Sequence, residues 1–222
     1  MLMSAVFILC LLFLAPGTAN VGLGGKSLLF PAKTNNAYIK INPDKPLSLT
    51  AFTLCMRAAA EQIRDRKVIL FAYRTANDDE FNVWKERNGS ISFYLRSSSD
   101  GVIYDLSPLS TLQTHLCFTW DSATGLSAAW VDGRRSAYRL YRKGHSIRSG
   151  GIVMLGQDAD SYLGGFDIEQ SFVGEITDVK LWDYILPANQ IEALNGKKEV
   201  QLANVFDWNT IKYEIYNNVL VV

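Results

Sequence analysis

The segment GQDADSYLGGFDIEQS, from Gly156 to Ser171, concentrates side-chain oxygens that could hold a metal ion. It contains four acidic residues and no basic residue, although the whole chain carries 22 basic and 22 acidic side chains. A second acidic group, NDDE at residues 77–80, directly precedes the sequence FNVW. Carboxylate and amide oxygens are ligands that calcium prefers. A contiguous EF-hand is excluded, because Tyr162 and Leu163 stand at the fifth and sixth positions counted from Asp158. The alternative to a metal site is a solvated acidic loop.

The sequence contains no motif of the common hydrolases or zinc enzymes. G-x-S-x-G, H-E-x-x-H and clustered zinc-type cysteines are all missing. His115 lies in a strand-like segment that also carries a cysteine, which favours a structural role. Asp167 and Glu169 could form a glycosidase pair, but no third acid follows at a suitable spacing. NVGLGGKS at residues 20–27 lacks the first glycine of a phosphate loop, so we expect a frayed N-terminal arm there. We therefore expect a protein that is not an enzyme.

Residues 1–19 have the features of a secretory signal peptide, with an apolar run followed by small residues. We therefore expect a secreted, extracellular protein whose domain spans residues 20–222, without membrane insertion. Loss of Cys10 with the signal leaves Cys55 and Cys117, a pair that suggests one disulfide in an oxidising compartment. The zero formal charge gives no indication of nucleic-acid binding.

Alternating apolar residues predict β-strands along most of the chain. In AFTLCMR (51–57) and HLCFTWD (115–121), the bulky side chains occupy one face and the cysteines the other. Asn-Gly and Asp-Gly pairs, which are typical of tight hairpins, stand at 88–89, 100–101 and 132–133. LPANQIEALNG at 186–196 predicts one short helix that ends at a glycine. Together these patterns predict an all-β, two-sheet antiparallel sandwich with one short helix, in a single domain.

The segment HLCFTWDSATG carries the pattern His-x-Cys-x-Thr-Trp-x-Ser, which resembles the signature of the pentraxin family. Further likenesses are spread over the chain from roughly Gly25 to Ile215: LLFPAKTNNAYI, AFTLC, WVDG, LGQDADS, SFVGEITDVKLWD and VFDWNTIKYEI. The resemblance implies a flattened jelly roll with a disulfide between Cys55 and Cys117. It also implies a site for two calcium ions on one face of each subunit.

The resemblance further implies which residues hold the calcium ions. They are two acids before FNVW and five positions in the acidic loop: Asp78, Asp79, Asp158, Ala159, Asp160, Asp167 and Gln170. Ala159 would act through its backbone carbonyl. These groups provide fewer oxygens than two ions need, so water or ligand oxygens would complete the shells. Gly164 and Gly165 would let the loop fold back. Without metal, the clustered acids should repel one another and loosen the loop.

Asn82, Trp84 and Tyr94 occupy the positions of the family's ligand pocket by this resemblance, with Ser99 or Asp100 near the place of an acid that holds choline. An aromatic ring can bind a quaternary ammonium through a cation–π contact. The alternative for Trp84 is a place in the strand core. The expected ligands are phosphocholine, phosphoethanolamine, a phosphorylated sugar or another carbohydrate.

The resemblance implies a calcium-dependent pattern-recognition lectin of innate immunity. Family members assemble as cyclic homo-oligomers, often pentamers, in which multivalent binding offsets weak single sites. Asn88 begins the sequon NGS and is a candidate glycosylation site. Two alternatives stay open. One is an adhesive module similar to laminin-G-like domains, with one calcium ion or none, and the other is a sandwich-fold glycosidase.

Overall fold

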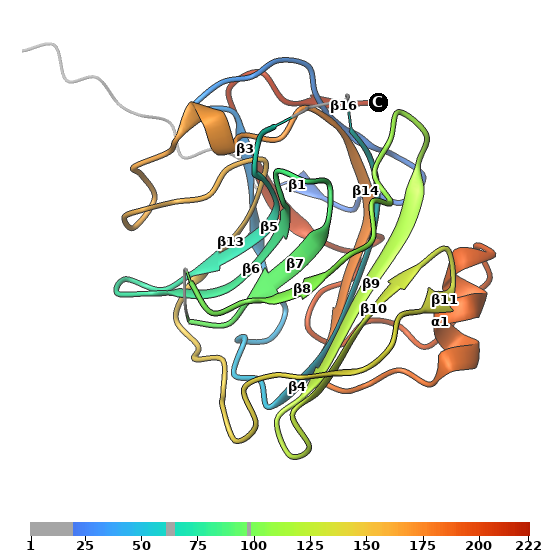
Figure 1. Cartoon of the computed structure of the whole chain (residues 1–222). Helices are drawn as coiled ribbons and strands as arrows, with labels where there is room; N and C mark the ends of the chain where they lie inside the picture. The colour runs from blue at the N-terminus through green and yellow to red at the C-terminus, as the bar shows by residue number, and fades with distance from the viewer. Residues whose placement is uncertain (1–19, 61–64, 97–98) are drawn as a thin grey trace, which may run out of the picture.

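The computed structural model describes residues 20–60, 65–96 and 99–222. The predicted signal peptide at residues 1–19 lies outside the described residues. Two eight-stranded antiparallel sheets pack against each other (Figure 1), which confirms the predicted all-β sandwich. No helix in the described ranges is long and apolar enough to cross a membrane.

The first sheet carries both acidic segments. Its strands, in spatial order, are β1 (Asn20–Val21), β15 (Lys212–Tyr216), β3 (Tyr38–Asn42), β13 (Ile152–Leu155), β5 (Val68–Arg74), β6 (Asp79–Lys85), β7 (Ile91–Tyr94) and β8 (Val102–Tyr104). Strand β5 separates β13 from β6. The acidic loop that follows β13 must therefore cross β5 to reach the acids at the start of β6.

The second sheet forms the other layer. Its strands, in spatial order, are β11 (Arg134–Arg135), β10 (Leu126–Val131), β9 (Thr114–Asp121), β4 (Ala51–Ala60), β14 (Gly174–Trp182), β2 (Leu28–Phe30) and β16 (Leu220–Val221), and β12 (Arg139–Leu140) also pairs with β10. The helix α1 (Ala188–Asn195) lies beside this sheet, whereas the short 3₁₀ helix η1 (Ile168–Gln170) lies at the opposite side of the molecule (Figure 1).

The bulky side chains of β4 and β9 fill the space between the sheets, as their alternation predicts. Phe52, Leu54 and Met56 of β4 are fully buried there, together with Phe118 and Trp120 of β9. Burial of such large apolar side chains is the main favourable contribution to folding.

Cys55 and Cys117 lie on the other face of the same two strands. They are direct register partners, with Cα atoms 4.1 Å apart, and they form the disulfide that the resemblance implies. Leu186 and Ile191 cover the disulfide from the α1 side. The helix ends at Gly196, in agreement with the sequence prediction.

The local sequence predicts the hairpin turn at Asp132 and Gly133 correctly, but it does not predict the N-terminal segment. Asp132 and Gly133 both have positive φ, 47° and 77°, which suits the tight hairpin between β10 and β11. The frayed N-terminal arm is wrong, because Leu23 is fully buried and Val21 pairs with Lys212 of β15. Pairing with a strand far along the chain overrides the local glycine-rich pattern.

Candidate metal and ligand site

Arg74, at the end of β5, connects the two acidic segments. Its Nη1 donates to Asp79 Oδ1 over 2.5 Å, and its Nη2 donates to the backbone carbonyl of Asp160 over 2.8 Å. Asp79 begins β6, whereas Asp160 lies in the loop after β13. The acidic loop therefore folds back across β5, and the two segments meet on one side of the sheet.

Asn82 and Asp158 form a second connection between these segments. Asn82 Nδ2 donates to Asp158 Oδ1 over 2.8 Å, and both side chains are buried. Burial and the neighbouring charges of Asp79 and Asp160 raise the pKa of Asp158 to about 7. Burial also raises the pKa of Asp79, although Arg74 opposes this effect. The cluster thus has more negative charge than its neighbours compensate, and a cation would stabilise it.

Arg148 and Arg96 neutralise the acids on either side of Asp79. Asp78 forms an ion pair with Arg148. The fully buried Glu80 accepts hydrogen bonds from Arg148 Nε at 2.6 Å and from Arg96 Nε at 3.0 Å. Burial opposes ionisation of Glu80, but the hydrogen bonds from Arg96 and Arg148 outweigh it and hold its pKa below the usual value. Glu80 therefore serves as a structural counter-ion to Arg96 and Arg148.

The helix η1 positions the last two predicted metal ligands. Asp167 Oδ1 caps it by accepting a hydrogen bond from the Glu169 backbone N–H at 2.9 Å. Gln170 Oε1 is buried and has no hydrogen-bond partner among the described atoms. A buried carbonyl oxygen without a partner is costly, and a hard cation would satisfy it. The place of the Asp167 carboxylate beside Asp79 and Asp158 stays a prediction.

Arg66 holds η1 against the start of β5. Its guanidinium donates to the carbonyl oxygens of Ile168, Glu169 and Ser171 over 3.3, 2.8 and 2.7 Å. Lys33 adds an ion pair to Glu169. These basic residues restrain the loop, so they oppose the loosening that repulsion among its acids would cause.

Gly165 allows the tight return of the acidic loop. Its φ is +72°, and a Cβ atom there would lie 3.1 Å from the Cβ of Asp160. Ala159, in the same loop, is fully buried. The close approach agrees with the role predicted for the paired glycines.

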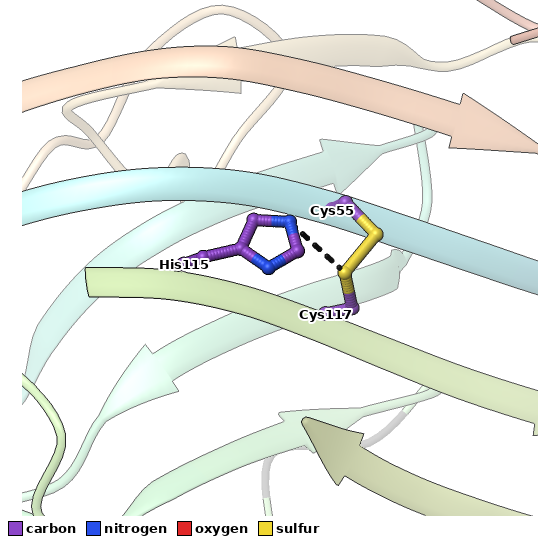
Figure 2. A group of neighbouring side chains, drawn as sticks. All are labelled: Cys55, His115 and Cys117. Carbon is purple, nitrogen blue, oxygen red and sulfur yellow. Dashed lines mark hydrogen bonds between the residues drawn. A yellow bond between two sulfur atoms is a disulfide. The ribbon is translucent and has the colours of Figure 1, made fainter. Parts of the chain in front are cut away.

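A different group has the spacing of a metal centre. Among the described residues, Cys55, His115 and Cys117 are the three potential ligand side chains whose atoms lie within 4.8 Å of one another. Figure 2 shows His115 Nε2 beside Cys117 Sγ, 3.5 Å apart, with both sulfurs joined in the disulfide. Zinc binds cysteine as a thiolate, which a disulfide does not provide. Burial lowers the pKa of His115 to about 4, so the ring is neutral at pH 7. The group is therefore structural.

Asn82, Trp84 and Tyr94 all lie on the outer face of the first sheet. Asn82 and Tyr94 are register partners on β6 and β7, and Trp84 follows Asn82 on the same side of β6. Trp84 and Tyr94 belong to a buried cluster that also contains Ala159 of the acidic loop. This cluster is separate from the core between the sheets. The predicted pocket residues thus share one face with the predicted metal ligands.

Sequence analysis missed two charged residues at this aromatic pair. Lys67 Nζ lies 4.8 Å from the ring centre of Trp84 and 4.3 Å from that of Tyr94. Glu86 Oε1 lies 3.3 Å from Lys67 Nζ and accepts a hydrogen bond from Tyr94 Oη at 3.0 Å. No local pattern marks either residue, because the pairing of β5 with β6 brings them together only in the folded sheet.

Three further predicted residues lie at the surface. Asp100 forms an ion pair with Arg142 over 2.9 Å, and its neighbour Ser99 is exposed. The acid beside the aromatic pair is therefore Glu86. Asn88 is exposed in the turn between β6 and β7, where its Oδ1 accepts a hydrogen bond from the Ser90 backbone N–H at 3.0 Å. Its glycosylation stays a prediction.

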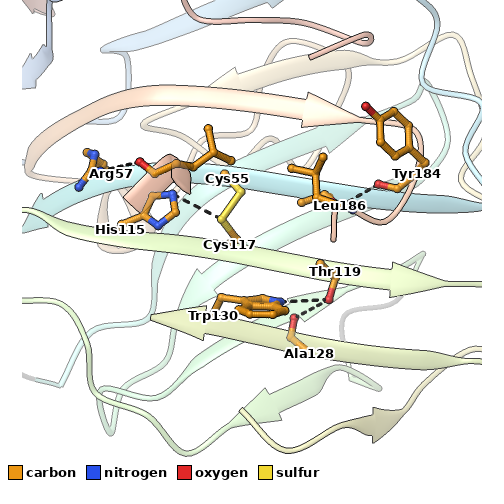
Figure 3. Close-up of a disulfide and its surroundings, with 11 residues drawn as sticks. Cys55, Arg57, His115, Cys117, Thr119, Ala128, Trp130, Tyr184 and Leu186 are labelled. Atoms are coloured by element: carbon orange, nitrogen blue, oxygen red, sulfur yellow. Dashed lines mark hydrogen bonds between the residues drawn. A yellow bond between two sulfur atoms is a disulfide. The ribbon is translucent and has the colours of Figure 1, made fainter. Parts of the chain in front are cut away.

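A hollow with a volume of about 570 Å³ lies on the disulfide side of the molecule, where Arg57 and His115 are among the residues that line it. Arg57 Nη2 donates to the carbonyl oxygens of Leu194 and Asn195 at the end of α1, over 3.0 and 2.6 Å. Figure 3 shows Arg57 and His115 to one side of the disulfide and Leu186 to the other. Arg57 therefore fixes the helix against the sheet, and no residue of the acidic loop contributes to this hollow.

An antiparallel jelly roll with a disulfide between neighbouring strands, and with an acidic loop folded over its outer face, defines a lectin-like sandwich domain. The family model described as the Pentaxin family matches residues 26–222. The chain belongs to the pentraxin family. Pentraxins are recognition proteins that generally bind calcium.

The sequence is similar to several named relatives. It is 58% identical to C-reactive protein of Danio rerio over 90% of this chain and 89% of that protein. It is 44% identical to the Pentraxin fusion protein of Xenopus laevis over 90% of this chain and 48% of that protein. The native heptameric SAP-like pentraxin of Limulus polyphemus superposes with a TM-score of 0.76 at 22% identity, covering 88% of this chain and 94% of that one. That structural likeness shows the jelly-roll fold.

Proposed function

We propose that this chain is the subunit of a secreted, calcium-dependent pattern-recognition lectin of innate immunity. Its ligands are phosphate-bearing groups or carbohydrates on cell surfaces. The proposed ligands for two calcium ions are the two acids that precede and begin β6 and five positions of the loop after β13: Asp78, Asp79, Asp158, Ala159, Asp160, Asp167 and Gln170. The proposed pocket continues from them along the outer face of the sheet through Asn82, Trp84 and Tyr94.

The observation that carries this proposal is the convergence of Asp79, Asp158 and Asp160 around Arg74 and Asn82. Carboxylates from distant segments repel one another unless positive charge holds them together. The donor set consists of carboxylate, amide and carbonyl oxygens without an available thiolate or imidazole. Such a set fits a hard cation such as calcium better than a transition metal.

Each part of the site has a distinct task in this proposal. Bound calcium would supply positive charge that a phosphate or carboxylate oxygen of the ligand can coordinate. Arg74 and Asn82 orient the acids, and Arg66 fixes η1 with Gln170. The aromatic side chains next to Asn82 offer contact area to the remainder of the ligand.

We also propose that the subunits form a closed ring, and the heptameric state of the similar Limulus polyphemus pentraxin supports an assembly of several subunits. Leu126 of β10 and Leu140 of β12 are register partners, and 38% and 79% of their surfaces are exposed. A pair of apolar side chains exposed at the edge of a sheet is a candidate subunit contact. A ring presents several sites together, which raises avidity for a patterned surface.

Calcium titration calorimetry tests the proposed metal site. We expect two ions per subunit for the wild type and weaker calcium binding in Asp160→Ala. The matched control is Glu169→Gln, because Glu169 belongs to the same loop but pairs with Lys33. We expect this control to bind calcium as the wild type does. A stoichiometry of zero or one would favour the adhesive laminin-G-like alternative, and wild-type calcium affinity in Asp160→Ala would contradict the assignment.

Affinity columns that carry phosphocholine, phosphoethanolamine or agarose test the recognition function. We expect retention in calcium on at least one column and elution with a chelator. Retention that a chelator does not weaken would reject the calcium-dependent mechanism. Hydrolysis of a panel of glycosides would instead support the glycosidase alternative.

A further inference from the structure

Lys67 places its ammonium over the rings of both Trp84 and Tyr94. Its ammonium lies 4.8 Å and 4.3 Å from the two ring centres. Glu86 holds it there through an ion pair of 3.3 Å. Ser92 Oγ and Tyr94 Oη fix Glu86 in turn, donating to its Oε1 over 2.6 and 3.0 Å. The chain therefore supplies its own cation to the aromatic pair and anchors it.

This internal cation lies next to the proposed metal site. Asp158 accepts a hydrogen bond from Asn82, and Asn82 is the register partner of Tyr94. Tyr94 and Trp84 pack in one cluster with Ala159, the backbone ligand proposed for calcium. A ligand whose phosphate lies at the acids would therefore direct its tail along this face toward Lys67.

We propose that Lys67 determines which ligands the site accepts, according to the chemistry of the tail attached to the phosphate. This inference rests on the proposed function. The site selects a phosphomonoester with a hydroxyl-bearing tail, such as a phosphorylated sugar or polyol, over one with an ammonium tail. A ligand ammonium would meet a like charge a few ångströms away and would find the ring faces occupied. The lysine ammonium has three donors, and one is directed to Glu86, so the others can donate to ligand hydroxyls.

Three phosphomonoesters with similar tail lengths isolate the effect of the tail. Phosphocholine carries an ammonium, 3,3-dimethylbutyl phosphate is its uncharged carbon isostere, and glycerol 3-phosphate carries hydroxyls. Each is titrated into the calcium-loaded, assembled protein by calorimetry. We compare the wild type with Lys67→Gln and with Lys40→Gln. Lys40 is the matched control, because it forms a similar ion pair with Glu214 on the same sheet, away from the aromatic pair.

For the wild type, we expect glycerol 3-phosphate to bind on the order of tenfold tighter than phosphocholine, and the neutral isostere at least as tightly as phosphocholine. Lys67→Gln should raise the affinity for phosphocholine relative to its isostere by roughly tenfold. Lys40→Gln should leave the wild-type order unchanged.

Different failures identify different errors. Absence of calcium binding in the calorimetric calcium titration would reject the proposed function itself. If calcium binds, a wild-type preference for phosphocholine over its isostere overturns the role of Lys67. The same holds if Lys67→Gln leaves the affinity ratio unchanged, or if none of the three esters binds. A circular dichroism spectrum and calcium stoichiometry equal to those of the wild type verify that each variant is folded.

Discussion

Asn82 donates a hydrogen bond to Asp158 over 2.8 Å, and only 4% and 5% of the two residues' surfaces are exposed. The bond joins the middle of β6 to the loop that follows β13. An amide can donate to a carboxylate, whereas a second carboxylate could not without taking up a proton. The amide at position 82 therefore allows a buried acid to be held in place before any cation binds.

The substitution Asn82→Asp should lower the stability of the calcium-free protein and make its stability depend more strongly on calcium. Without calcium, the new carboxylate repels Asp158, and we expect a loss of about 1–3 kcal/mol in the free energy of unfolding. With calcium, the additional negative charge favours the cation, so the stabilisation by calcium should exceed that of the wild type. Thermal unfolding with a chelator and with calcium measures both effects. Asn88→Asp, the same change in an exposed turn, is the control and should leave both unfolding curves near those of the wild type. Equal calcium stabilisation in Asn82→Asp and the wild type would separate Asn82 from the metal site.

The fold could be predicted because its signals are local. Alternation in β4 placed Phe52 and Cys55 on opposite faces, and the structure has Phe52 in the main core and Cys55 in the disulfide on the other side. The Asp132–Gly133 turn and the helix that ends at Gly196 depend on residues within a few positions of each other. The acidic positions came from the family resemblance, and the structure brings the carboxylates of Asp79 and Asp158 close enough to affect each other.

The parts that sequence could not predict depend on long side chains from distant strands. Arg74 and Arg66 reach the acidic loop from the two ends of the β5 segment, and neither lies in an acidic motif. Lys67 contacts Trp84 only because β5 and β6 are neighbours. Leu23 is buried just after Asn20 and Val21 pair with β15, and its backbone N–H donates to the Trp208 carbonyl, which a glycine-rich local pattern does not reveal. Such contacts are determined by topology, so one-dimensional spacing cannot identify them.

Removal of the disulfide should destabilise the domain without altering the outer face of the first sheet. The double variant Cys55→Ala with Cys117→Ala opens a loop of 62 residues, which corresponds to about 4 kcal/mol on the chain-entropy estimate. Urea unfolding at fixed protein concentration measures the loss. Calcium stoichiometry at low urea should remain that of the wild type, because the disulfide lies on the second sheet. Loss of calcium binding in a variant that is still folded would show coupling between the two sheets that this prediction does not include.

Leu140→Glu should disrupt assembly, because it places a charge on the most exposed large apolar side chain of the described residues. We expect sedimentation to show smaller species, with calcium binding per subunit unchanged. Leu202→Glu is a matched control, since Leu202 is 66% exposed at the hollow beside Arg57, away from β12. Assembly equal to that of the wild type in Leu140→Glu would place the subunit contact elsewhere.

His115 should make stability depend on pH between neutrality and pH 5. Burial, with the nearby Arg57 charge, lowers its pKa from 6.5 to about 4. The unfolded chain therefore takes up a proton as the pH falls below 6.5, whereas the folded chain does not until the pH approaches 4. The stability is fully present above pH 6.5 and is lost as the pH falls through this window, by about 2 kcal/mol between pH 7 and pH 5.

The variant His115→Gln separates this contribution from the titration of carboxylates, which both proteins share. Urea unfolding of the wild type and the variant at pH 7 and pH 5, at equal protein concentration, gives the difference in slope. We expect the variant to be less stable at pH 7, because it disturbs packing beside Cys117, but to lose less stability on acidification. Parallel pH profiles of the two proteins would mean that His115 becomes protonated in the folded state near its ordinary pKa, and the burial argument would then fail.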